Sequence, residues 1–144
     1  MAKVRIGIVG LGFMAATHLR AYQKVADAQI AALCSPSGRH LDGDFTTVAG
    51  NINTGDPLKL DMTGIAAFRD FDEMLARGNL DVVDICAPTA AHRELTVKAL
   101  AAGKHVLCEK PFARTSAEAK EMVDAARKAN RILMPAMPLR FWPQ

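Results

Sequence analysis

Short apolar runs alternate with polar or glycine-containing stretches along the whole chain. Several of the runs are rich in β-branched residues and are bounded by turn residues, which is the pattern of buried strands. These runs predict strands over residues 4–9, 28–34, 65–68, 81–87, 105–108 and 131–134.

Between the strands, apolar residues recur at helical spacing, as Leu19, Tyr22 and Val25 do. Strand and helix therefore alternate, which implies a parallel sheet. With right-handed crossovers, the predicted fold class is α/β, a Rossmann-like doubly wound parallel sheet with helices on both faces. The predicted helices span residues 13–25, 70–77, 91–102 and 116–130.

The segment 41–64 is rich in glycine and shows no sustained period. A loop of this length is unusual in a compact domain, so it is either functional or an insertion. Asn51, Asn53 and Asp56 offer oxygen ligands for a cation, but the spacing of a calcium loop is absent. We interpret the segment as a solvated loop.

Composition excludes several classes of function. The 144 residues suit one domain, half of them are apolar, and the net charge is only +3, with no run of basic residues. We therefore expect neither a nucleic-acid partner nor a membrane partner, and strand-like sequence from Lys3 argues against a signal peptide. Cys34, Cys86 and Cys108 lack metal or disulfide spacing, so we expect no metal, reduced thiols and a cytoplasmic location.

A glycine-rich turn joins the first predicted strand to the first predicted helix. In Gly10-Leu11-Gly12-Phe13-Met14-Ala15, Gly10 permits a tight turn and Gly12 lets a pyrophosphate approach the backbone. The helix start at Phe13 and Met14 offers unpaired N–H groups to the phosphates. The alternative is a glycine turn without a ligand, and the strand–helix context favours the dinucleotide. No Gly-Lys-Ser or Gly-Lys-Thr follows, which excludes a P-loop.

The second strand ends in Ser35 rather than in the acid that commonly binds the ribose 2′-hydroxyl of NAD. Ser35, Ser37 and Arg39 suit a 2′-phosphate, which a guanidinium grips with two hydrogen bonds. We therefore favour NADP over NAD as the cofactor. In the alternative interpretation Arg39 is solvated, and Asp42 or Asp44 reaches back to the ribose.

Two further strand ends carry candidate residues. Ala87, Pro88 and Thr89 follow a strand at the edge where doubly wound folds bind ligands, so we expect them to line the cofactor. His92 opens the next helix, either as a structural partner or as a catalytic group near the cofactor.

Glu109-Lys110-Pro111 follows the next strand, at residues 105–108. Lys110 there is suited to act as a general acid or to orient a hydroxyl, with Glu109 holding its ammonium and lying near the cofactor. A strand-end ion pair capped by a proline turn is the alternative. The glycine turn at the same edge favours the functional interpretation.

These motifs together resemble a known family of oxidoreductases. The stretches Gly10–Ala15, Ala87–His92 and Ala102–Pro111 are similar to those of the glucose-fructose oxidoreductase, inositol dehydrogenase and MocA group. The resemblance implies binding of NAD or NADP and hydride transfer at a carbinol or carbonyl carbon of a sugar, an inositol or a related polyol. It also places Lys110 near the nicotinamide and the substrate. Ser35 departs from the acid of many members, and segment 41–64 is longer than usual.

The resemblance also implies a second, C-terminal domain. Residues 1–136 are then the NAD(P)-binding domain, and residues 137–144 begin the crossing into a domain absent from this chain, with Arg140 as a further cofactor contact. We expect cofactor binding but little turnover from this chain alone, and self-association through exposed Phe141 and Trp142, which would give a homo-oligomer. The alternative function is a non-enzymatic NAD(P)-binding sensor or regulatory domain.

Overall fold

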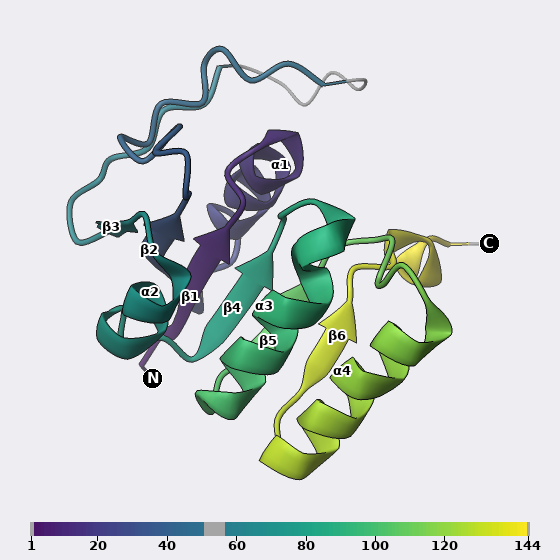
Figure 1. Ribbon diagram of the computed structural model, residues 1–144. Helices are drawn as coiled ribbons and strands as arrows, with labels where there is room; N and C mark the ends of the chain where they lie inside the picture. The colour runs from purple at the N-terminus through teal and green to yellow at the C-terminus, as the bar shows by residue number, and fades with distance from the viewer. Residues whose placement is uncertain (1, 51–56, 144) are drawn as a thin grey trace.

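A single six-stranded parallel sheet forms the centre of the molecule (Figure 1). The computed structural model describes residues 2–50 and 57–143. The strand order is β3-β2-β1-β4-β5-β6. The first three strands are added toward one side of β1 and the last three toward the other, so the order of addition reverses between β1 and β4. This topology confirms the predicted α/β doubly wound fold. The strands are β1 (Val4–Val9), β2 (Ala28–Cys34), β3 (Ala66–Phe68), β4 (Val82–Ile85), β5 (His105–Cys108) and β6 (Leu133–Pro135).

Helices cover both faces of the sheet, as the sequence predicts. In Figure 1, α2, α3 and α4 lie on the viewer's side, and α1 lies behind the sheet. Two separate apolar clusters match this division, one around Leu19 of α1 and the other around Met74 of α2, Leu100 of α3 and Met122 of α4. The helices are α1 (Phe13–Tyr22), α2 (Phe71–Arg77), α3 (Thr89–Ala101) and α4 (Ser116–Ala129), followed by a short 3-10 helix, η1 (Pro138–Phe141).

Several predicted element ends are wrong by a few residues. The helix predicted to Val25 ends at Tyr22, because the chain there turns through short backbone hydrogen bonds and Val25 is exposed. The strand predicted over 81–87 ends at Ile85, so Cys86 and Ala87 belong to the turn beyond the sheet. The third helix begins earlier than predicted, at Thr89, directly after Pro88, which is the N-cap residue.

The described parts of segment 41–64 contradict its interpretation as a solvated loop. Phe45 and Leu58 are buried in the same cluster as Leu19 of α1. The backbone N–H of Phe45 donates to the carbonyl of Leu58 at 2.9 Å, which joins the two arms of the segment. The arms therefore contribute core on the α1 face of the sheet. Asn51, Asn53 and Asp56, the candidate cation ligands, lie outside the described residues.

The chain beyond β6 is exposed, as predicted for Phe141 and Trp142, whose exposed fractions are 70% and 66%. Self-association through them stays a prediction. Within the described residues, no helix combines the length and the apolar character needed to cross a membrane.

Candidate functional site

The turn after β1 leaves an open space at the start of α1. Gly10 has a φ of +87°, and a Cβ on it would lie 2.4 Å from the backbone nitrogen of Ala87. A Cβ on Gly12 would meet no atom within 4 Å, and no side chain caps the helix that Gly12 begins. Backbone N–H groups at a helix start are thus free to meet an anion in a space that no side chain of residues 2–50 or 57–143 fills. The residues present fit a pyrophosphate.

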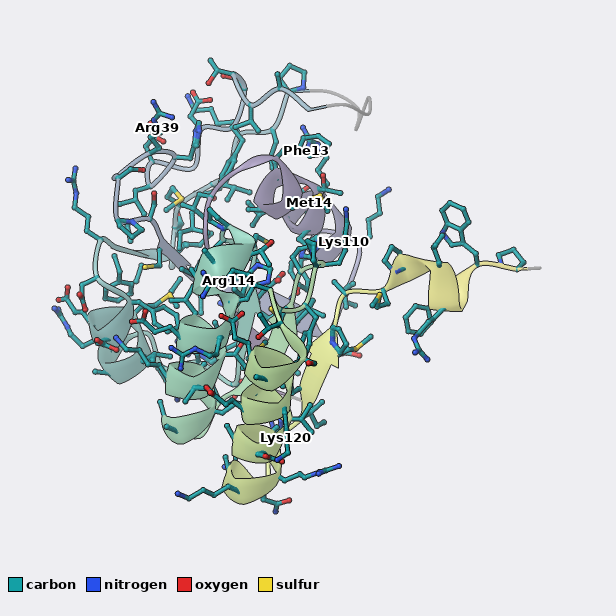
Figure 2. All side chains as sticks on the ribbon, turned by 45° about the vertical axis from the view of Figure 1, so that its right-hand side comes forward. Phe13, Met14, Arg39, Lys110, Arg114 and Lys120 are labelled. Carbon is teal, nitrogen blue, oxygen red and sulfur yellow. The ribbon has the colours of Figure 1, made fainter. Side chains whose placement is uncertain are left out.

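Phe13, Met14 and Ala15 form the first turn of α1. Ala15 is fully buried, which allows the close packing of helix on strand that the sequence predicts. The ring of Phe13 packs against Gly50, at the end of one described arm of segment 41–64. Figure 2 shows Phe13 and Met14 at the same end of the molecule as Lys110, with Lys120 toward the opposite end.

Two arginines, Arg39 and Arg69, follow the ends of the paired strands β2 and β3. Ser35 is buried, and its hydroxyl lies 3.1 Å from that of Ser37, which also accepts from the backbone N–H of Arg39 at 3.3 Å. A Cβ on Gly38 would lie 2.5 Å from the guanidinium of Arg69, so this side chain reaches over the turn from the end of β3. Neither the Arg39 nor the Arg69 side chain makes a hydrogen bond or ion pair with another described residue. Both guanidinium groups are available to a ligand.

Arg69 was not predicted from the sequence. It follows a strand of three residues, and nothing along the chain indicates that β3 pairs with β2 at this point. Asp42 and Asp44, the alternative ribose ligands, are engaged in their own turns. Asp42 accepts from the backbone of Asp44, and Asp44 accepts from Thr46, whose hydrogen bonds lower the pKa of the Asp44 carboxyl.

His92 is fully buried, and both of its ring nitrogens face backbone carbonyls. Nε2 lies 2.8 Å from the oxygen of Ala87, and Nδ1 lies 2.9 Å from that of Pro111. The ring therefore ties the turn after β4 to the Glu-Lys-Pro corner after β5. Of the two interpretations of His92, the geometry favours the structural partner. Pro88 is exposed and Thr89 half-exposed at the same turn, so both remain open to a ligand.

Glu109 contacts the backbone of Lys110 and not, as the sequence predicts, its ammonium group. Its carboxylate accepts the backbone N–H of Lys110 at 2.8 Å and makes no ion pair with the Lys110 ammonium. The expectation that Glu109 holds the ammonium is therefore wrong, because the carboxylate is buried and already used. The exposed Lys110 side chain has no partner among the described residues, and the peptide bond to Pro111 is cis.

A partly buried polar cluster, which we call the His18 cluster, lies beside this corner. Its members are His18 and Tyr22 of α1, Asp84 of β4, Cys86 and Glu109. His18 Nδ1 lies 2.8 Å from an Asp84 oxygen, and Nε2 lies 3.0 Å from a Glu109 oxygen. Tyr22 donates to Asp84 at 2.9 Å, and the Cys86 thiol lies 3.6 Å from the other Asp84 oxygen.

The electrostatics of the His18 cluster follow from burial and from its two carboxylates. Burial alone lowers the pKa of His18, but the hydrogen bonds and charges of Asp84 and Glu109 outweigh it and raise that pKa above its usual value. Burial, followed by the charge of Asp84, raises the pKa of both Tyr22 and Cys86, which keeps them protonated. His18, Asp84 and Cys86 also form a group of potential metal ligands, with atoms within 4.8 Å of one another.

His18, Tyr22 and Asp84 were missed by sequence reasoning. The available signal was a lone acid, Asp84, inside an otherwise apolar strand. This acid alone does not indicate which residue pairs with it, because His18 is 66 residues away along the chain. Arg140, predicted to contact the cofactor, lies exposed on η1, and its side chain makes no hydrogen bond or ion pair with the described residues.

The glycine turn, the helix start and the reversal of strand order between β1 and β4 define a dinucleotide-binding domain. The family described as "Oxidoreductase family, NAD-binding Rossmann fold" matches residues 4–137, and the chain belongs to this family. The resemblance drawn from the sequence motifs is thereby confirmed.

Relatives of this family include dehydrogenases of inositols and sugars. The chain is 35% identical to scyllo-inositol 2-dehydrogenase (NADP(+)) of Bacillus subtilis, over 97% of this chain and 38% of that protein. It is 34% identical to D-apiose dehydrogenase of Paraburkholderia graminis, over 94% and 32%. The chain thus spans about a third of the length of these relatives.

Solved structures agree with this placement. An oxidoreductase from Agrobacterium radiobacter in complex with NAD+, L-tartaric acid and magnesium matches with a TM-score of 0.80 and 29% identity, over 97% of this chain and 37% of that one. Scyllo-inositol dehydrogenase from Lactobacillus casei, with bound NAD(H) and scyllo-inositol, matches with a TM-score of 0.78 and 27% identity, over 97% and 38%.

Proposed function

We propose that this chain is the dinucleotide-binding part of an NAD(P)-dependent oxidoreductase that acts on a polyol, an inositol or a sugar. The observation that carries the proposal is the open space at Gly12, bounded by the free N–H groups of the α1 start, at the edge that also carries Lys110. Pyrophosphate binding there directs the rest of an extended dinucleotide along this edge. The names of the dehydrogenase relatives support the substrate class.

The cofactor, when bound, supplies or accepts the hydride at its nicotinamide. Lys110 is the proposed catalytic residue, because its side chain is exposed and unpaired among the described residues. When a carbinol is oxidised, its hydroxyl proton passes to the neutral amine form of Lys110, and when a carbonyl is reduced the Lys110 ammonium returns a proton to oxygen. Glu109, Ala87, Pro88 and Thr89 shape the site around this group.

We propose NADP as the preferred cofactor. The Arg69 guanidinium reaches over the turn after β2, Arg39 follows in the same turn, and no carboxylate stands at Ser35, where NAD-binding folds commonly have one. Asp42 and Asp44 are used in local turns, which weakens the alternative that favours NAD. The Bacillus subtilis relative carries NADP(+) in its name, whereas the Lactobacillus casei structure holds NAD(H).

We further propose that residues 1–136 form the cofactor domain and that 137–144 lead toward a second domain that completes the substrate site. The chain spans only about a third of the length of its relatives, which supports this division.

We also propose a cytoplasmic location. The three cysteines are free, which supports a reducing, cytoplasmic setting.

Exchange of Lys110 for alanine tests the catalytic proposal in the protein that carries the second domain. Lys110→Ala should abolish hydride transfer and leave the Kd for NADPH within about twofold, because Lys110 is proposed to contact only the reacting end. Lys120→Ala is the matched control, since Lys120 is an exposed α4 lysine paired with Asp124, far from the glycine turn. Turnover that survives in Lys110→Ala contradicts the proposed role.

A further inference from the structure

The His18 cluster joins the pyrophosphate-binding helix to the corner that carries the proposed catalytic lysine. His18 and Tyr22 lie on α1, Asp84 lies on β4, and Glu109 follows β5 directly. Asp84 is fully buried and Glu109 nearly so, while the His18 side chain is 15% exposed. Carboxylates in such a place are stabilised by hydrogen-bond donors and by positive charge.

The surroundings of the His18 ring favour its doubly protonated form. Each ring nitrogen faces a carboxylate oxygen, at 2.8 Å for Asp84 and 3.0 Å for Glu109. A neutral imidazole has one N–H and one lone pair, and a lone pair facing a carboxylate is repelled. An imidazolium donates to both oxygens, and its charge offsets part of the charge of the two acids. His18 is therefore the cation of this cluster.

A bound metal ion accounts less well for the same atoms. Tetrahedral zinc, with bonds of about 2.0 Å to nitrogen and oxygen, holds such ligand atoms about 3.3 Å apart. The distance from His18 Nδ1 to Asp84 is 2.8 Å, which is that of a hydrogen bond. Tyr22 donates to the same Asp84 oxygen at 2.9 Å, which gives that oxygen a second hydrogen-bond donor.

Glu109 transmits the position of His18 to Lys110. One carboxylate oxygen of Glu109 accepts from His18, and the other accepts the backbone N–H of Lys110 at 2.8 Å. The orientation of this carboxylate therefore sets the orientation of the Lys110 peptide. Without His18, one oxygen of the buried Glu109 loses its donor, and the carboxylate is free to rotate toward water.

We propose that His18 is a positioning residue for Lys110. The imidazolium of His18 holds the Glu109 carboxylate, and that carboxylate fixes the Lys110 backbone at the nicotinamide end of the site. This role rests on the proposed function for the importance of Lys110. In this proposal α1 serves two parts of the site. Its N-terminus binds the pyrophosphate, and its second turn, which carries His18, supports the corner that carries Lys110. Cofactor binding and lysine placement are then separable by mutation.

The test follows two backbone amides of this chain by NMR during titration with NADPH. In the wild-type protein, the Gly12 and Lys110 amide signals should shift with one Kd. In His18→Gln, Gly12 should shift with a Kd within about threefold of wild type, while the Lys110 response is lost and its amide exchanges about tenfold faster. His105→Gln is the matched control, because His105 accepts from Ile132 N at the start of β5, and it should change neither signal.

An unchanged Lys110 response and exchange rate in folded His18→Gln overturn the positioning role, as does a neutral or metal-bound His18 imidazole in the wild-type ¹⁵N spectrum at pH 7. If His18→Gln does not fold, Glu109→Gln keeps the His18–Asp84 pair and should lose the same Lys110 response. If neither NADPH nor NADH shifts any amide, the proposed function fails, while the Lys110 exchange rate and the imidazole spectrum still test His18.

Discussion

Gly10 and Ala87 come so close that a Cβ on Gly10 would lie 2.4 Å from the Ala87 backbone nitrogen. The φ of Gly10, +87°, is also unfavourable for any side chain. Gly10→Ala should therefore lower the free energy of unfolding by at least about 2 kcal/mol. Gly64 has a φ of +77° with no atom near its Cβ position, so Gly64→Ala measures the cost of the backbone conformation alone. Equal losses in the two variants, measured by urea unfolding, would contradict the close approach.

At Gly12, in contrast to Gly10, a methyl group should weaken cofactor binding and leave stability nearly unchanged. No atom of the described part of the chain lies within 4 Å of the Gly12 Cβ position, so Gly12→Ala should change the free energy of unfolding by less than about 1 kcal/mol. The methyl group would nevertheless occupy the space assigned to the pyrophosphate, and NADPH affinity should fall at least about tenfold. A calorimetric titration checks this, and undiminished affinity would show that the pyrophosphate binds elsewhere.

The two arginines at the end of β2 should decide between the cofactors. Arg39→Ala and Arg69→Ala should each weaken NADPH binding by about tenfold, because each removes a charged hydrogen-bond donor from the 2′-phosphate. The Kd for NADH should stay within about twofold, since NADH lacks that phosphate. Arg77→Ala, which removes an exposed guanidinium paired with Glu73 on α2, is the control and should affect neither cofactor. A parallel loss of NADH affinity would refute the 2′-phosphate assignment.

His18 should make stability fall as pH rises through the neutral range. Its pKa is raised in the folded chain, so the folded state binds more protons than the unfolded state above the ordinary value of 6.5. The stability from His18 is complete below pH 6.5 and is lost as pH passes the folded pKa, at a slope of at most about 1.4 kcal/mol per pH unit. Asp84 and Glu109 supply the attraction, the Cys86 thiol lies 3.5 Å from His18 Nδ1, and Tyr22 donates to the Asp84 oxygen that His18 contacts.

Urea unfolding of wild type and His18→Gln between pH 6 and pH 8 isolates this slope. The range stays below the ordinary cysteine pKa of about 8.5, above which ionisation in the unfolded chain adds a loss of stability because burial raises the pKa of Cys86. The difference between the two proteins should shrink as pH rises. A constant difference across the range would mean that His18 does not carry the extra proton.

Phe45 tests whether segment 41–64 is part of the core. The side chain is fully buried against the α1 face, so Phe45→Ala should lower the free energy of unfolding by about 3–5 kcal/mol. The neighbouring Thr47 is exposed, and Thr47→Ala should change it by less than about 0.5 kcal/mol. Similar small effects in both variants would restore the interpretation of this segment as a solvated loop.

The sequence predicts those features whose cause is local. The strands, the helices and the glycine turn are visible because periodicity and turn residues lie within a few positions of one another. Phe45 was missed because its burial depends on pairing with Leu58 across the segment rather than on any period. Arg69 and the His18–Asp84 pair were missed because strand order, not sequence spacing, brings them to the site.

Parallel titration of this chain with NADPH and NADH is the most direct test of cofactor binding. Trp142, on the exposed chain after η1, and the reduced nicotinamide provide fluorescence signals for both titrations. We expect saturable binding of both cofactors, with NADPH tighter by about tenfold. Tighter binding of NADH would contradict the assignment of Arg39 and Arg69, and binding of neither cofactor would contradict the dinucleotide site itself.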